Sequence, residues 1–352
     1  MKKIYYIAVV FATLFLAGCG DGIDLPGVNV ETDLNKIPLP DNNVNLEQVE
    51  LKPSTEPMLH EGLHTEEDFQ RIRDKKAAGE EPWVSAYQLL VESQFSQKTA
   101  DTYPTEWIKR GVSGDENYMN AARGATIAYQ QALRWKIEQD DEYAAKAVEN
   151  LNKWVQTCVG VTGNTNLSLA AGLYGYEFAI AGELLRDYGG WDRADFAAFQ
   201  NWLLKVFYPA NDDFLKRHHD TNALHYWANW CLCNIAAKMA IGIVTDRRDI
   251  YNEGIAHLQT GDTNGRLRRA IYHDYAPDYN FAQWQESGRD QGHTLMCVGL
   301  MGIICQLAWS QGDDFFAYDD NLFLRACEYA ACCNYTNETV PYTTYIWQKQ
   351  SQ

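Results

Sequence analysis

Hydrophobic residues recur at helical spacing, three or four positions apart, through most of this chain. The pattern predicts a helix through Ala144–Val155 and a longer one over 167–185 that ends before Gly189. Asp192 is expected to cap a further helix that carries apolar residues as far as Phe207. No convincing run of alternating strand residues occurs before residue 335. Successive helices with short connections predict an all-α fold, and periodicity alone does not choose between a bundle and a toroid.

Local signals also mark helix starts in the N-terminal third. Thr65 is expected to begin a capped helix that runs to Lys76, because Asp68 follows three residues later. Pro82 suits the first turn of the next helix.

The segment 282–309 begins with polar and charged residues and then becomes apolar. If it is helical from Gln285 onward, Glu286, Arg289 and His293 lie on one stripe, which continues into apolar positions. Burying ionisable groups costs several kcal/mol unless they are paired or used. The pattern therefore indicates either a site at one end of a buried helix or an internal Glu286–Arg289 salt bridge with a capping histidine.

A second segment, HYWANWCLCN at 225–234, has the same character. On a helix, His225 and Asn229 share one face, while Tyr226 and Trp230 lie on the neighbouring stripe. A single histidine on an apolar face is more often a core residue than a catalyst. Two such helices with interleaved aromatic residues favour a cleft of carbohydrate size.

These runs carry a resemblance to a known family. HYWANWCLCN, AQWQESGRDQGHTLMCVGLMG, HEGLHTEEDFQRIRDKKAAGEEPW and LAAGLYGYEFAIAGELLRDYGGW together make the chain, over about residues 57 to 347, resemble the alginate lyase superfamily of polysaccharide lyases. The resemblance implies an (α/α) incomplete toroid and β-elimination at uronic acid residues, without a metal or other cofactor. The implied partner is an acidic polysaccharide.

The match to the family's site is incomplete. A well-studied branch uses an asparagine-histidine pair before a Tyr-Trp, together with an arginine and a tyrosine. Here Tyr226 and Trp227 match, but Asn222 and His225 are separated by two residues. The family tyrosine that follows the arginine is replaced near His293.

The chemistry of a uronate lyase assigns provisional roles. A cation beside the C6 carboxylate stabilises the enediolate that forms when the C5 proton leaves, and Arg289 is the first candidate, with Asn229 or Asn222 assisting. His225, His293 and Tyr226 are the candidate acid and base groups. The remaining substrate-binding candidates are two tryptophans that could stack on sugar rings and two polar neighbours: Trp227, Trp284, Gln285 and Glu286.

The sequence leaves two other functional classes open. A glycoside hydrolase on an (α/α) scaffold could use Glu286 and Asp290 as its carboxylate pair. A surface lipoprotein could bind glycans through its aromatic residues without catalysis.

The N-terminus predicts an exported protein. Lys2 and Lys3 precede an apolar run that ends in Leu-Ala-Gly-Cys, so residues 1–18 are predicted to be a lipoprotein signal and Cys19 the lipidated residue. The run is short for a membrane span. Residues 19–56 are predicted to be a flexible tether and 57–352 the toroid domain, anchored by lipid in the bacterial cell envelope, periplasmic or on the outer membrane. Chains with this pattern usually continue beyond VPYTTY, which suggests a C-terminally truncated domain.

The formal net charge of −17 opposes binding of a polyanion and argues against nucleic acid as a partner. A local basic region lies between the two candidate site segments and either lines the cleft or is a set of solvated surface charges: Arg247, Arg248, Arg266, Arg268, Arg269 and His273. The cysteines lack the spacing of a zinc module, so no metal is assigned. The polymer cleaved, endo or exo action and the oligomeric state are not determined by the sequence.

Overall fold

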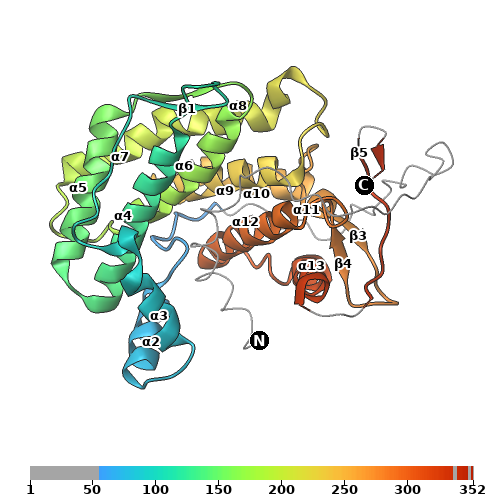
Figure 1. Ribbon diagram of the computed structural model, residues 1–352, viewed down its shortest axis with the longest axis horizontal. Coiled ribbons are helices and arrows are strands. Elements are labelled where there is room, and N and C mark those ends of the chain that lie inside the picture. Colours follow the sequence, from blue (N-terminus) through green and yellow to red (C-terminus); the bar gives the residue numbers. More distant parts are fainter. Residues whose placement is uncertain (1–54, 336–338, 348–349, 352) are drawn as a thin grey trace.

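The computed structural model describes residues 55–335, 339–347 and 350–351. The described chain is mostly helical, and one row of helices forms its centre (Figure 1). In this row, neighbours in sequence order pack against one another: α4 (Tyr118–Glu138), α6 (Leu167–Leu184), α9 (Ala228–Val244) and α12 (Gln291–Ser310). The connecting helices pack outside this row: α5 (Asp141–Thr157), α7 (Arg193–Val206), α8 (Tyr208–Arg217), α10 (Arg248–Thr260) and α13 (Tyr318–Tyr335). The arrangement is an (α/α) incomplete toroid, as expected.

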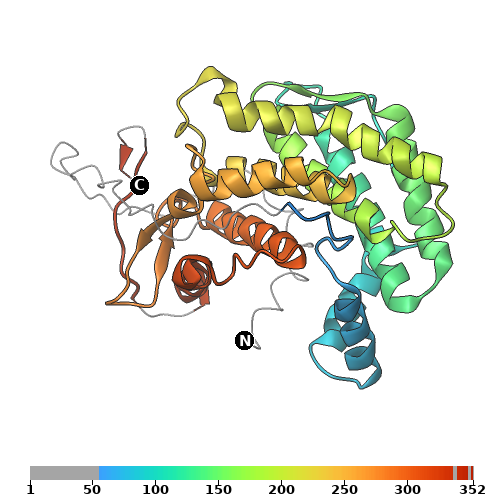
Figure 2. The ribbon, with the colours of Figure 1, turned by 180° about the vertical axis from the view of Figure 1, so that it is seen from behind.

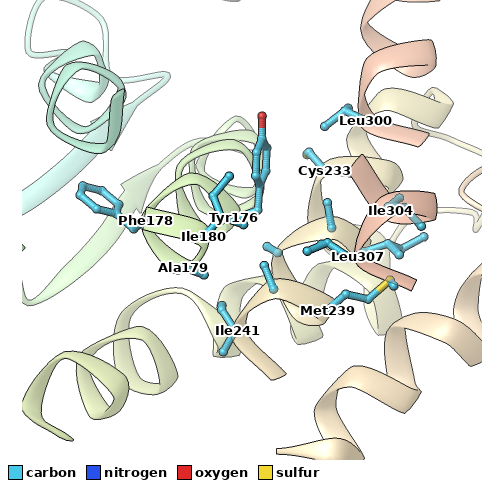
Figure 3. Close-up of a cluster of buried hydrophobic side chains, with 14 of the residues drawn as sticks. Tyr176, Phe178, Ala179, Ile180, Cys233, Met239, Ile241, Leu300, Ile304 and Leu307 are labelled. Carbon is cyan, nitrogen blue, oxygen red and sulfur yellow. The ribbon is translucent and has the colours of Figure 1, made fainter. Parts of the chain in front are cut away.

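Composition explains which helices are central. Every residue of α9 except Trp230 is buried, and α6 is buried on nearly all sides, so neither helix has a polar face to turn to water. By contrast, α5 and α7 bury one face and expose the other. Figure 3 shows the core where three central helices meet, with Phe178 and Ile180 from α6, Met239 and Ile241 from α9, and Leu300, Ile304 and Leu307 from α12.

The predicted helix starts at Thr65 and Asp192 are confirmed. Thr65 and Asp68 form a reciprocal capping box at the start of α2 (Glu66–Ala77), and the Asp192 side chain accepts a hydrogen bond from the Ala194 backbone N–H at the start of α7. Pro82 directly precedes α3 (Trp83–Glu92) instead of standing inside its first turn. Figure 2 shows α2 and α3 projecting together from one end of the toroid.

The structure contains short strands that the sequence pattern did not predict. β1 (Trp107–Arg110) pairs in parallel with β2 (Gly160–Gly163), and β3 (Ile271–Asp274) pairs antiparallel with β4 (Ala282–Trp284). Near the C-terminus, β5 (Ile346–Trp347) pairs with β6 (Gln350–Ser351). Three or four residues are too few to display an alternating pattern, because a period of two needs a longer run to be recognised. Short helical turns complete the chain: η1 (Gln94–Ser96), η2 (His218–Asp220) and α11 (Leu267–Ala270).

Two predicted helix boundaries are wrong. α12 begins at Gln291, not at Gln285, because Gln285–Arg289 form a turn after β4 and the Asp290 side chain caps the helix. Likewise α9 begins at Ala228, so His225 lies in the segment before it. The helical stripe of Glu286, Arg289 and His293 therefore does not exist; Arg289 contacts Glu286, while His293 contacts Asp290.

Among the described residues, α12 is the one helix that is long and apolar enough to cross a membrane by length and composition. It packs between α9 and α13 in the core, which accounts for its apolar character. The predicted signal, Cys19 and most of the tether lie outside the described residues.

Candidate active site

The N-terminal ends of the four central helices are linked to one another by side-chain contacts. On one side, the Arg110 guanidinium lies 4.7 Å from the ring centroid of Tyr118, the first residue of α4, and Tyr118 stacks on Tyr174 of α6 at 6.5 Å. In the first turn of α6, Ser168 Oγ lies 3.0 Å from His219 Nε2. We call this end of the toroid the mouth: the first turns of α4, α6, α9 and α12 and the segments that precede them.

The other half of the mouth joins α9 to α12. Gln285 Oε1 accepts a hydrogen bond from the Ala228 backbone N–H, the first of α9, at 3.1 Å. Asp290 caps α12. Helix N-termini carry partial positive charge, and no side-chain hydrogen bond caps α4 or α6, so the mouth favours an anionic ligand although the whole chain is acidic.

Arg289 is the cation of this site. Its guanidinium lies 4.6 Å from the ring centroid of Trp227, and Nη2 donates to Oε1 of the buried Glu286. The side chain is 31% exposed, and its remaining nitrogens have no acceptor among the described residues. Burial lowers the pKa of Arg289 from its ordinary value. The arginine is thus held by two neighbours and still presents donors outward.

Asp290 and His293 form a second pair beside Arg289. Asp290 Oδ2 lies 2.6 Å from His293 Nδ1, while Oδ1 accepts from the His293 backbone N–H at 2.9 Å. Burial opposes ionisation of Asp290, but the hydrogen bonds from His293 outweigh it and hold the pKa of the carboxyl below its usual range. The His293 side chain is 41% exposed, so the imidazole is accessible to a ligand.

Several buried polar atoms at this site have no hydrogen-bond partner in the structure. They are Asn229 Oδ1, Glu286 Oε2 and Ser287 Oγ. Asn229 is 3% exposed, and its amide nitrogen has only a weak contact, 3.7 Å to Met296 Sδ. Orphaned buried polar groups are costly unless water or a ligand satisfies them, so their concentration here marks a polar binding region.

A cluster of histidines surrounds Tyr226, which lies in the segment before α9. The Tyr226 ring centroid lies 4.8 Å from that of His225, 5.8 Å from His219 and 6.1 Å from His218. Burial, reinforced by the two neighbouring histidines, lowers the pKa of His218 to about 4, so His218 is neutral near pH 7. The sequence analysis missed His218 and His219; the signal that could have found them is a histidine doublet a few residues before Asn222.

Two predicted substrate-binding residues are placed elsewhere. Trp284 is 1% exposed, its indole N–H donates to the Ala326 carbonyl at 3.0 Å, and its ring packs on Phe323, so it is a core residue and not a surface for sugars. Asn222 is exposed, and its Oδ1 accepts from the Leu224 backbone N–H at 2.8 Å, which fixes a local turn. No contact brings Asn222 to Arg289 in the part of the chain that the structure describes.

Most arginines of the basic region predicted between the two segments already have partners within the fold. Arg247 pairs with Asp249, and Arg268 pairs with Asp319. Arg248 donates to the backbone carbonyls of Glu56 and Pro57, and Arg269 to that of Asp262. These contacts place Arg247, Arg248, Arg268 and Arg269 in ion pairs and backbone hydrogen bonds of the fold, which neither the cleft-lining nor the solvated-surface expectation described.

A C-terminal segment forms one wall of the mouth. The Gln283 side chain is fully buried. Its amide nitrogen donates to the Thr343 carbonyl and its amide oxygen accepts from the Thr343 N–H, both at 2.8 Å, which is the pair of hydrogen bonds that a neighbouring strand would make. The segment thereby places the Tyr345 ring 5.5 Å from Trp227 and 4.6 Å from Tyr272. The sequence analysis named neither Gln283 nor Tyr345.

No group of three or more His, Cys, Asp or Glu side chains within the described ranges could hold a metal ion. The side chains of the mouth themselves offer a cation at Arg289, a carboxylate-held imidazole at His293, aromatic faces and amides.

Comparison with known proteins identifies the fold and the family. The family model described as alginate lyase matches residues 72–338. This chain belongs to the alginate lyase family, a family of polysaccharide lyases. Comparison with curated proteins finds no match.

The family's solved structures share the toroid. A histidine-to-alanine variant of alginate lyase A1-III, complexed with tetrasaccharide, is similar with a TM-score of 0.60 at 14% identity, over 80% of this chain and 82% of that one. Alginate lyase A1-III from Sphingomonas species A1 gives 0.55 at 13% identity, covering 79% and 80%. An alginate lyase from Bacteroides ovatus gives 0.54 at 14%, covering 76% and 82%. At these identities the likeness establishes the fold of this member.

Proposed function

We propose that this lyase cleaves a uronic-acid-containing polysaccharide, alginate or a related polyuronate, by β-elimination at the 4-O-linkage. The observation that carries the proposal is Arg289, held between Trp227 and the buried Glu286 with donors still directed outward. A planar guanidinium suits a carboxylate, and an indole beside it suits the face of a sugar ring.

In the proposed reaction, a base takes the proton from C5 of the uronate. The electrons of the broken C5–H bond form the C4=C5 double bond while the C4–O4 bond breaks, and an acid protonates the departing O4. Arg289 stabilises the negative charge that develops on the C6 carboxylate in the transition state, as an oxyanion hole does. The amide of Asn229 supports the same carboxylate.

His293 is our candidate for the base. Asp290 fixes one ring nitrogen at 2.6 Å, which leaves Nε2 as the nitrogen that can accept a proton. His225 and Tyr226 are candidates for the acid that protonates O4. Assigning these roles requires the pH dependence of single variants.

The two carboxylates that a hydrolase could use, those of Glu286 and Asp290, already have partners in the structure. Glu286 is buried and paired with Arg289, and Asp290 both caps α12 and holds His293. Hydrolysis by a carboxylate pair needs one group to donate a proton to the glycosidic oxygen and the other to act on the opposite face of the sugar. Neither carboxylate is free for such a role.

The test is a rise in ultraviolet absorbance when the protein is mixed with alginate, glucuronan, hyaluronan or chondroitin in separate reactions, since β-elimination creates a conjugated double bond. A rise with one polymer identifies its substrate class. New reducing ends without absorbance would instead mean hydrolysis.

We also propose that the protein is exported and anchored by lipid at Cys19 in the bacterial envelope. The support is the sequence alone: two lysines, an apolar run and Leu-Ala-Gly-Cys. Expression with a radiolabelled fatty acid tests it: label should enter the wild type and be absent from Cys19→Ser. Label in both proteins, or in neither, would contradict the proposal.

A further inference from the structure

A groove lies on the flank of α4, outside the site described above. Its volume is about 250 Å³, and it lies between the first turns of α4 and the segment 94–103. Its lining includes Phe95, Thr99, Asp101, Tyr103, Asn120 and Arg123.

Arg123 gives the groove its charge. It is exposed, and it forms no ion pair with any of the described residues. Several other arginines of this acidic chain are neutralised by carboxylates, as Arg134 is by Glu138 and Arg186 by Glu183. The one carboxylate in the lining, Asp101, is paired with Lys153 at 2.7 Å, so the Arg123 guanidinium is left for an anion, and its planar fork favours a carboxylate.

The remaining lining suits a sugar. Tyr103 is 74% exposed and presents an aromatic face, and Phe95 is partly exposed beside it. Asn120 and the neighbouring Thr99 offer an amide and a hydroxyl for hydrogen bonds. Aromatic faces combined with a few polar groups are typical of carbohydrate-sized sites.

The groove adjoins the mouth. Arg123 follows Tyr118 by five residues on α4, which is about 7.5 Å along the helix axis. The segment that carries Tyr103 continues into β1, where Arg110 lies over Tyr118. Five residues also turn the helix by about 140°, so a polymer held in the mouth would have to pass around the end of α4 to reach Arg123.

We propose that this groove is an auxiliary binding site for an acidic oligosaccharide stretch of the polymer, in which Arg123 binds a uronate carboxylate and Tyr103 stacks on a sugar ring. The inference rests on the proposed function for the identity of the polymer. It extends that function, because it makes chain length a determinant of affinity.

Kinetics on long and short substrates test the groove. Arg123→Ala and Tyr103→Ala should each raise KM for the polymer roughly three- to tenfold, with kcat unchanged, and leave the kinetics on a tetrasaccharide unaltered. The matched control is Lys205→Ala, which removes an exposed positive charge from α7, away from the groove. An equal effect on the tetrasaccharide, no effect on the polymer, or an equal effect of Lys205→Ala would overturn the proposal.

A binding measurement separates this proposal from the catalytic one. Calorimetric titration of an alginate decasaccharide into Arg289→Ala, with and without Arg123→Ala, does not depend on turnover. A three- to tenfold weaker Kd for the double variant, roughly, supports the groove even if no polymer is cleaved. An unchanged Kd, or no binding to either protein, contradicts it.

Discussion

The Asp290 carboxylate makes two contacts with His293: one oxygen accepts the backbone N–H at 2.9 Å, and the other lies 2.6 Å from Nδ1 of the ring. A single side chain therefore starts α12 and orients the imidazole. The two functions can be separated, because asparagine is as good an N-cap as aspartate but cannot place a negative charge beside the ring.

We expect Asp290→Asn to retain the thermal stability of the wild type within about 1 kcal/mol and to lower kcat about tenfold or more with little change in KM. His293→Ala should lower kcat further, by roughly 10²–10⁴. Steady-state kinetics and thermal unfolding check both variants. A loss of stability with unchanged kcat would show that Asp290 is only a helix cap.

Trp227 and Trp284 were both predicted from the sequence to bind substrate, but substituting them should have different effects on stability and binding. Trp284→Ala removes a buried core side chain and should destabilise the fold by about 3–5 kcal/mol. Trp227→Ala removes the partly exposed ring beside Arg289 and should weaken substrate binding with a smaller stability loss. Denaturant unfolding combined with KM measurements distinguishes the two residues. Similar stability losses would contradict the assignment of Trp227 to the site.

The sequence predicts local features of this fold well. Capping at Thr65 and Asp192 depends on residues two or three positions apart, and both caps are present. The Glu286–Arg289 salt bridge of the second reading also forms, but the residue that caps α12 is Asp290 and not a histidine.

Features that depend on distant residues could not be predicted. Gln285 is held outside α12 by the Ala228 N–H of another helix and by the Ala270 carbonyl. Trp227 and Trp284 have the same side chain and differ only in what packs over them. The contacts of His219 with Ser168 and Tyr226 arise from the path of a loop that has no periodic pattern.

The turn that carries Arg289 packs Gly288 against the end of the Tyr342 side chain. A Cβ atom there would lie 2.0 Å from the Tyr342 hydroxyl oxygen, so either Tyr342 or the turn must move. We expect Gly288→Ala to lower kcat/KM severalfold or more, because misplacing a reacting group by about 1 Å costs up to ~10²-fold. The control is Gly189→Ala, where a Cβ meets nothing within 4 Å. Equal activity of both variants would show that the position of this turn does not matter to catalysis.

Glu177 on α6 makes the stability of the fold depend on pH. Burial raises the pKa of this carboxyl to about 8, against the lowering effect of a hydrogen bond with Tyr176. Between the ordinary value of 4.5 and a pH of about 8, the folded state binds more protons than the unfolded state, so the free energy of unfolding falls as pH rises.

We therefore expect Glu177→Gln to be more stable than the wild type at about pH 8, by a few kcal/mol at most, and to match it near pH ~4. Glu67→Gln, at an exposed position of α2, makes the same change of charge as a control. Thermal unfolding across this pH range provides the measurement. If the stabilities of the wild type and Glu177→Gln changed in parallel with pH, the conclusion that Glu177 is protonated in the folded protein would be wrong.

The most direct test of the central claim is the ultraviolet absorbance of the protein with each polyuronate, repeated with Arg289→Lys. Lysine keeps the charge beside buried Glu286 but loses the planar fork, so the fold should persist while kcat falls about 10²–10³-fold. We predict an absorbance rise with one polymer for the wild type and nearly none for Arg289→Lys. No rise with any polymer, or full activity in Arg289→Lys, would contradict the account.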